Sequence, residues 1–78
     1  MSVTAYVLIQ TEVGRAERVA SAARDIPGVV TSDNVAGPYD VIVKTEADTL
    51  DDLGQLVVSA IQKVEGITRT FTCPIVNL

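Results

Sequence analysis

The chain has 78 residues, of which 47% are hydrophobic and 21% charged, and its formal net charge at pH 7 is −4. A chain of this length forms one domain and buries only about 60–65% of the surface that its unfolded form exposes, so its aliphatic excess predicts apolar surface buried between subunits. Its six Lys and Arg residues are interleaved with acidic residues, which excludes the basic footprint of direct nucleic-acid binding.

No apolar run approaches the roughly 20 residues that span a bilayer, and no basic segment precedes the apolar N-terminal stretch. The one cysteine, Cys73, cannot form an internal disulfide, which agrees with a reducing compartment. We therefore expect a soluble cytoplasmic protein with no membrane partner.

The first expected element is a strand over residues 3–11, which are rich in β-branched and aromatic residues and apolar on both alternating faces. An amphipathic helix is expected over residues 15–26, and the pair Pro27 and Gly28 ends it. The residues at helical spacing on its apolar side are Ala16, Val19, Ala20, Ala23 and Ile26.

A second strand is expected over residues 29–35, although its middle is polar. Gly37 and Pro38 then reverse the chain, because Gly tolerates backbone angles closed to other residues and Pro fixes its own. A third strand is expected over residues 40–45, with one face formed by Val41, Val43 and Thr45. The second and third strands therefore form a hairpin.

A second helix is expected over residues 50–64, with Thr49 as its N-terminal cap and Gly66 ending it in a left-handed conformation. Its apolar stripe contains Leu50, Leu53, Leu56, Val57, Ala60, Ile61 and Val64. The last strand is expected over residues 67–76, and Pro74 within it indicates an edge or an end of the sheet.

The resulting order β-α-β-β-α-β predicts an α+β, ferredoxin-like fold. Two right-handed split crossovers give a four-stranded antiparallel sheet with both helices on one face. The other face is left uncovered. In a chain with so many aliphatic residues, that face is expected to pair with its copy, which predicts a homodimer through the open sheet face.

The residue content argues against catalysis. The chain has no histidine, which removes the commonest general base and most transition-metal sites. Asp51 and Asp52 are adjacent in sequence and point to different parts of a helix surface, so they are interpreted as helix-start charges rather than as an acid/base pair. Cys73 has no histidine to activate it and is expected to be a buried structural thiol. We expect no catalytic residue, no metal and no cofactor.

Two features could bind a ligand or a partner. The first is the hairpin tip, where Tyr39 and Asp40 follow the Gly37 and Pro38 reversal; the alternative is that these residues only turn the chain and pack locally. The second is the last strand, where a row of hydroxyls comes from Thr68, Thr70 and Thr72. The alternative there is that Thr is simply a good strand former. Arg69 in the same strand needs an acidic partner or solvent, and a surface ion pair is the simplest interpretation.

Four segments of the chain together resemble the effector-binding (RAM) domain of the Lrp/AsnC regulators. These segments are Ala5–Ile9, Ile26–Val29, Val35–Val41 with its Gly-x-Tyr-Asp sequence, and Val64–Thr70. The sequence begins directly at the first strand and so resembles the stand-alone versions of that domain. Residues 1–78 are accordingly expected to form a single ligand-binding domain without a helix-turn-helix domain.

The resemblance implies a dimer built by sheet packing, rings of dimers of the octamer or decamer class, and an amino acid or similar small effector bound between neighbouring dimers. It places ligand-binding residues at Gly37, Pro38, Tyr39, Asp40, Thr70 and Thr72. Asp40 suits an ammonium group, and backbone amides and threonine hydroxyls suit a carboxylate. Pro38 stands where many relatives have a polar residue, which could alter the choice of ligand.

The leading hypothesis is therefore a non-enzymatic, oligomeric module that senses an amino acid and modulates transcription by associating with full-length Lrp/AsnC regulators. One alternative is a small enzyme of the dimeric α/β-barrel type, which shares a dimer packed through sheets. Another is a pure oligomerisation module whose hairpin makes only subunit contacts.

Overall fold

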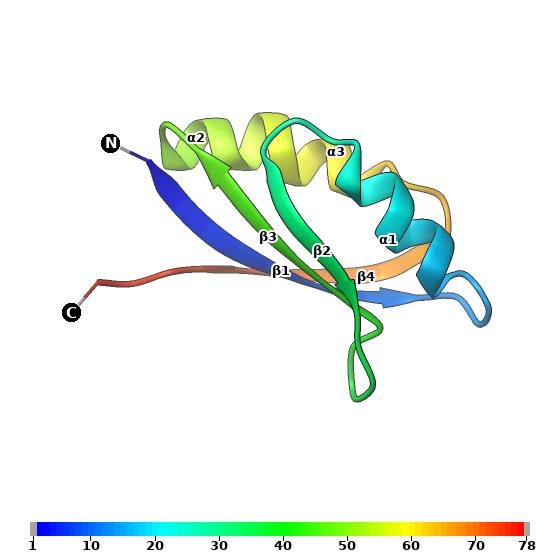
Figure 1. The fold of residues 1–78 in the computed structure, drawn as a ribbon. Coiled ribbons are helices and arrows are strands. Elements are labelled where there is room, and N and C mark those ends of the chain that lie inside the picture. The colour runs from blue at the N-terminus through cyan, green and yellow to red at the C-terminus, as the bar shows by residue number, and fades with distance from the viewer. Residues whose placement is uncertain (1, 78) are drawn as a thin grey trace.

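The computed structural model describes residues 2–77, apart from the side chain of Leu56, and shows the predicted order of strands and helices (Figure 1). The elements are β1 (Val3–Thr11), α1 (Ala16–Arg24), β2 (Val29–Asn34), β3 (Val41–Ala47), α2 (Leu50–Asp52), η1 (Leu53–Val58), α3 (Ser59–Gln62) and β4 (Ile67–Pro74). The segments α2, η1 and α3 follow one another without a break and form one helical rod. No helix within the described residues is long and apolar enough to cross a membrane.

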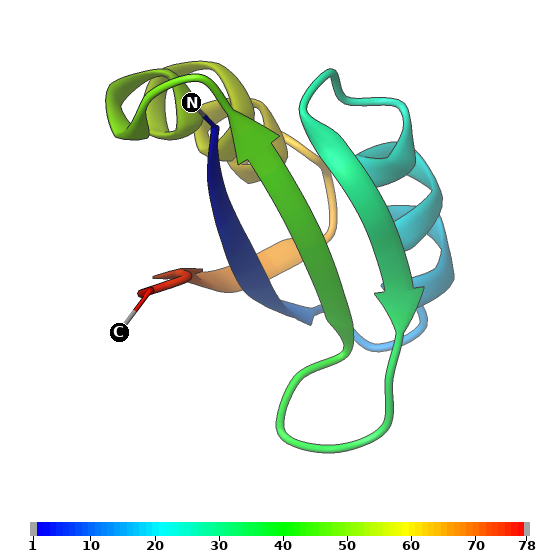
Figure 2. The same ribbon diagram turned by 60° about the vertical axis from the view of Figure 1, so that its left-hand side comes forward.

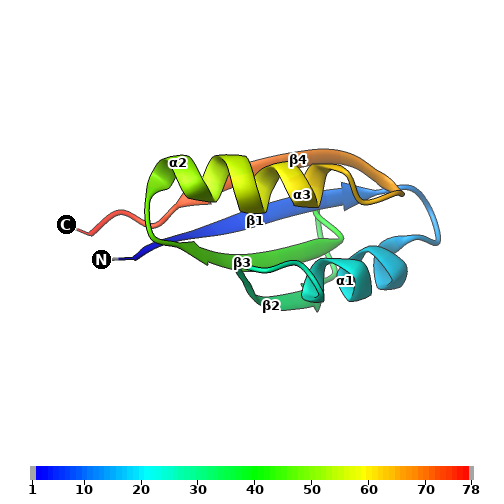
Figure 3. The same cartoon turned by 90° about the horizontal axis from the view of Figure 1, so that it is seen from above.

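The four strands form one antiparallel sheet in the order β2-β3-β1-β4. Both helical segments cover the same face of the sheet: α1 lies over the β2 and β3 half, and the rod from α2 to α3 lies over the β1 and β4 half (Figure 3). This is the predicted ferredoxin-like arrangement. Within residues 2–77, the other face of the sheet carries no helix, as expected (Figure 3).

The core lies between the sheet and the helices because alternate residues of each strand point to the same face. Every second residue from Ala5 to Ile9 in β1 is fully buried, and so is every second residue from Val41 to Thr45 in β3. The helices contribute Val19, Ala20, Ala23, Leu53, Val57 and Ile61. The predicted apolar side of the first helix is thus confirmed.

The helix boundaries differ slightly from those predicted. The first helix ends at Arg24 rather than at residue 26, because the N–H groups of Asp25 and Ile26 donate to carbonyls three residues back and tighten the last turn. In the second helix Thr49 caps as predicted: its hydroxyl oxygen accepts the N–H of Asp52 at 3.0 Å. Gly66 has φ +101° and so is left-handed, as predicted.

The second helix contains a π-helical segment from Leu53 to Val58 that the sequence pattern did not predict. The buried residues of the whole second helix, Leu53, Val57 and Ile61, follow one another at intervals of four. Leu50 was expected in this apolar stripe but is 59% exposed, because it lies in the first turn outside that row. Leu56, another expected member, lies outside the described side chains.

The expectation of a buried thiol at Cys73 is wrong for the single subunit. β4 is an edge strand, and Cys73 lies opposite Tyr6 on the uncovered face, where it is exposed. The strand ends at Pro74 rather than at residue 76, and the N–H of Ile75 makes the last ladder contact, to the carbonyl of Thr4 at 2.9 Å.

Gly28 packs against the second helix and provides a test of this layer. A Cβ atom at Gly28 would overlap Cγ2 of the buried Val57 and lie 3.1 Å from the carbonyl oxygen of Glu46, and the residue has φ +96°. Gly28→Ala should therefore lower the free energy of unfolding by about 2–4 kcal/mol through backbone strain and overpacking. Gly54→Ala is the matched control, because its Cβ would meet nothing within 4 Å; it should raise stability by up to about 1 kcal/mol. Urea denaturation measures the stability of both variants, and equal effects would contradict the close contact between Gly28 and Val57.

Candidate functional site

The segment between β2 and β3, residues 35–40, forms a loop that extends from the end of the sheet on the side away from the helices (Figures 1 and 2). The N–H of Val35 donates to the carbonyl of Asp40 at 2.9 Å and closes the loop. Gly37 has φ +147°, and a Cβ atom there would meet nothing within 4 Å. The hairpin predicted from Gly37 and Pro38 is therefore present, and its tip is open to solvent.

Asp40 joins this hairpin to the end of β1. Its Oδ2 accepts the backbone N–H of Thr11 at 2.8 Å and the Thr11 hydroxyl at 3.3 Å. The N–H of Asp40 donates to the carbonyl of Ile9 at 2.9 Å. Because β3 begins only at Val41, the Thr11 N–H lies beyond the last β1–β3 pair, and the carboxylate takes the place of the missing strand partner. One carboxylate oxygen thus positions the loop.

Pro38 and Tyr39 hold the loop against the uncovered face of the sheet. Nε2 of Gln10 in β1 donates to the carbonyl of Pro38 at 3.0 Å. The ring of Tyr39 meets the ring of Phe71 in β4 edge to face, with 5.9 Å between centroids and an interplanar angle of 73°. The tip therefore crosses the end of β1 and reaches β4.

Arg69 extends this contact. Its Cζ lies 5.7 Å from the centroid of the Phe71 ring, within range of a cation–π interaction. Arg69 pairs with Gln10 in the β1–β4 register, and Phe71 pairs with Leu8, so both lie on the uncovered face. The sequence alone does not connect Gln10, Arg69 or Phe71 with the hairpin, because only the strand register makes them neighbours.

The two predicted threonines point the other way. Thr70 pairs with the buried Ile9 and its hydroxyl accepts a hydrogen bond from Nε2 of Gln62 in α3 at 3.3 Å. Thr72 pairs with the buried Val7. Both threonines therefore lie on the helix side of the edge strand. The structure brings Gly37, Pro38, Tyr39 and Asp40 together in one loop but does not bring Thr70 or Thr72 to that loop within one subunit.

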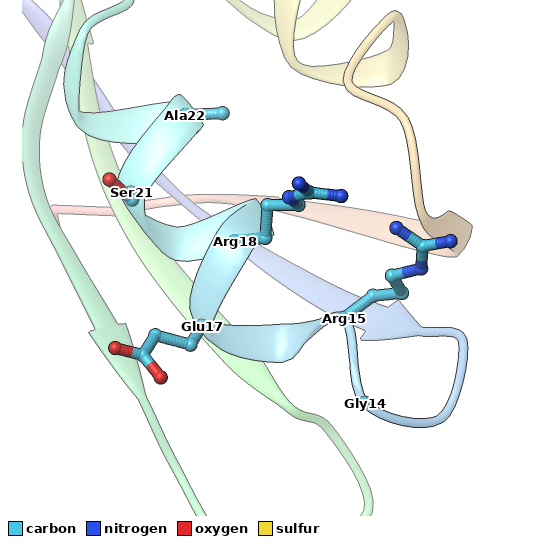
Figure 4. A pocket seen from close by; sticks show the side chains of 6 residues that line it. All are labelled: Gly14, Arg15, Glu17, Arg18, Ser21 and Ala22. Carbon is cyan, nitrogen blue, oxygen red and sulfur yellow. The ribbon is translucent and has the colours of Figure 1, made fainter.

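A separate shallow hollow runs along the outer surface of α1 (Figure 4). Its lining residues are Gly14, Arg15, Glu17, Arg18, Ser21 and Ala22. Arg15 and Arg18 extend toward the same side, and Glu17 points away from them (Figure 4). The hollow shares no residue with the hairpin, so the two are independent surfaces.

Comparison with known proteins identifies the relatives of this chain. The family model described as the Lrp/AsnC ligand binding domain matches residues 4–77. An uncharacterized HTH-type transcriptional regulator of Pyrococcus horikoshii is 31% identical over 75 residues, which cover 92% of this chain and 50% of the relative. The chain thus spans about half the length of the curated relatives that it matches.

Solved structures share the whole fold. A hypothetical protein from Pyrococcus horikoshii is 37% identical, with a TM-score of 0.86 over 97% of this chain and 92% of the other. A transcriptional regulator from Neisseria meningitidis, solved as its L-Met complex, is only 13% identical but has a TM-score of 0.81, over 96% of this chain and 50% of the other. At that identity the likeness shows the fold alone.

The contact between Asp40 and Thr11 can be tested directly. Asp40→Ala removes the carboxylate that accepts the Thr11 N–H, so it should lower stability by about 1–3 kcal/mol and accelerate hydrogen exchange at that amide. Asp40→Asn keeps a carbonyl oxygen at this position and should preserve most of the protection. NMR-detected hydrogen exchange measures the effect. Unchanged protection of the Thr11 amide in Asp40→Ala would contradict the positioning role.

Proposed function

The chain belongs to the Lrp/AsnC ligand-binding domain family, and we propose that it is a non-enzymatic sensing module that binds an amino acid or a similar small effector at its Gly37 hairpin. It acts as a homodimer formed through the open sheet face, and its dimers assemble further into a ring. The observation that carries this proposal is the loop formed by residues 35–40. A few main-chain and side-chain contacts hold this loop at the border of the sheet face that the helices leave uncovered.

The uncovered sheet face carries apolar residues suited to a subunit interface, beside the charged side chains of Lys44 and Asp33. Its partly exposed apolar residues, together with the extension of β4, are Tyr6, Leu8, Ile42, Phe71 and Ile75. Tyr6 and Phe71 are 40% and 42% exposed in the single subunit. Apolar residues gathered on one face of so small a domain mark an association surface, and a second copy of the same face is the simplest partner.

The hairpin suits a small zwitterion. Asp40 uses Oδ2 for Thr11, which leaves its other oxygen to accept from an ammonium group. Backbone N–H groups of the exposed tip can donate to a carboxylate. Charge-assisted hydrogen bonds contribute about 1.5–3 kcal/mol each, and two or three of them, less the cost of ordering the loop, give micromolar to millimolar affinity. The L-Met complex of the Neisseria regulator that shares this fold supports amino acids as the first ligands to test.

The proposed biological role is to modulate transcription through association with full-length Lrp/AsnC regulators in the cytoplasm. The relatives are named HTH-type transcriptional regulators, and this chain corresponds to half of their length. A shared domain that forms dimers and rings would allow the two kinds of chain to combine. The absence of histidine from the sequence supports a binding role rather than catalysis.

A second candidate is a pure oligomerisation module whose hairpin makes structural contacts only. The hydrogen bonds that Asp40 accepts from Thr11 favour it, because they explain the Asp of the Gly-x-Tyr-Asp sequence by a structural role alone. The two candidates share the dimer and differ in ligand binding.

The open-face dimer predicts the effect of a buried charge. Leu8→Glu places a carboxylate in the middle of the face and should convert the protein to a folded monomer, because removing a carboxylate from water between the subunits costs several kcal/mol. Leu50→Glu is the matched control, since Leu50 is exposed on the helix layer. Light scattering coupled to gel filtration gives the mass, and circular dichroism checks the fold. A wild-type protein that is monomeric at micromolar concentration would refute the dimer.

The sensor predicts measurable binding. Calorimetry with the twenty common amino acids should give at least one dissociation constant in the micromolar to millimolar range. Asp40→Asn, which keeps the acceptor for Thr11 but removes the charge, should weaken that binding about tenfold or more. Asp51→Asn in α2 is the control and should bind like the wild type. If no amino acid binds, the sensor is excluded and the oligomerisation module is favoured.

A further inference from the structure

The strand register changes which residues of β4 can reach the hairpin. Alternate residues of this strand face opposite sides of the sheet: the threonines lie on the helix side, and Arg69 and Phe71 lie on the side of the loop. Within a subunit, the β4 side chain that can offer donors beside the tip therefore belongs to Arg69, whose guanidinium lies against the ring that Tyr39 contacts, and not to a threonine. Arg69 carries the stronger donor for a carboxylate.

Arg69 is held in place by the same residues that hold the loop. Its guanidinium lies over the Phe71 ring, and Tyr39 of the tip contacts the same ring edge to face. Gln10, the register partner of Arg69, donates to the carbonyl of Pro38. Hairpin, β1 and β4 thus meet in one cluster that contains a cation and two aromatic rings.

The cluster lies at a corner of the uncovered face. β4 is an edge strand, and Arg69 pairs with the next-to-last residue of β1. A second subunit centred on Tyr6, Leu8 and Ile42 would leave this corner at the margin of the interface. Arg69 is exposed in the single subunit, and within residues 2–77 its guanidinium has a ring rather than a carboxylate as its partner.

We propose that Arg69 binds the carboxylate of the effector, while Phe71 and Tyr39 contact an apolar side chain of the same molecule. A guanidinium presents a planar fork of donors that matches a carboxylate, and stacking on a ring fixes that fork in advance. The aromatic surfaces beside it favour an apolar amino acid over a polar one. This inference rests on the proposed sensing function and names its ligand class.

The test compares each amino acid that binds with the amine that remains when its carboxylate is removed: isopentylamine for leucine, phenethylamine for phenylalanine. The wild type should bind the amine at least about tenfold more weakly than the amino acid. Arg69→Gln should weaken the binding of the amino acid by a similar factor and leave the binding of the amine unchanged. This pattern is expected if the guanidinium and the carboxylate interact with each other. Arg18→Gln, an exposed arginine on α1, should change neither.

Two results would overturn the role of Arg69 while leaving the sensor in place. One is an amino acid that binds Arg69→Gln as tightly as the wild type. The other is an equal loss of affinity for the amino acid and for the amine in Arg69→Gln. That result would mean that Arg69 supports the fold or the subunit contact and does not bind the carboxylate. If none of the twenty amino acids binds the wild type, the proposed function itself fails, and this inference fails with it.

Discussion

The pairing of β1 with a strand on each side is the constraint on which the rest of the structure depends. β1 is central in the sheet, and its alternation places Ala5, Val7 and Ile9 under the helices and Tyr6 and Leu8 on the uncovered face. A shift of one residue in either register would exchange the two faces and expose the core. The same alternation decides which residues of β3 and β4 can meet a helix, a partner subunit or a ligand.

The hairpin depends on β1 as well. β1 continues past the start of β3, and the unpaired Thr11 N–H is taken by Asp40. The side chain of Gln10 donates a hydrogen bond to the carbonyl of Pro38. Side-chain hydrogen bonds therefore attach the loop to the end of the sheet, where backbone pairing has stopped. They explain how an exposed turn with a glycine at its tip adopts a defined conformation. Such a loop can serve both a subunit contact and a ligand, because its backbone groups at the tip remain open to solvent.

Much of this architecture was predictable from local pattern. The strand over residues 3–11 was predicted to the residue, the cap at Thr49 and the left-handed Gly66 follow from known helix-end chemistry, and the reversal at Gly37 and Pro38 predicted the hairpin. The errors have a common cause. Exposure of Leu50 and Cys73 depends on which neighbour covers an element, and neither the first turn of a helix nor an edge strand carries that information in its own residues.

The sequence by itself determined the order of the elements, the uncovered sheet face and the candidate tip, because helix and strand periods, caps and turns are short-range properties of the chain. Only the tertiary structure decided what surrounds the tip. Phe71 is 32 residues from Tyr39 along the chain and becomes its neighbour through the β1–β4 register, and the same register turns Thr70 toward the helices. A register is set by packing between distant segments. The identity of the residues beside the hairpin is therefore a property of the folded sheet.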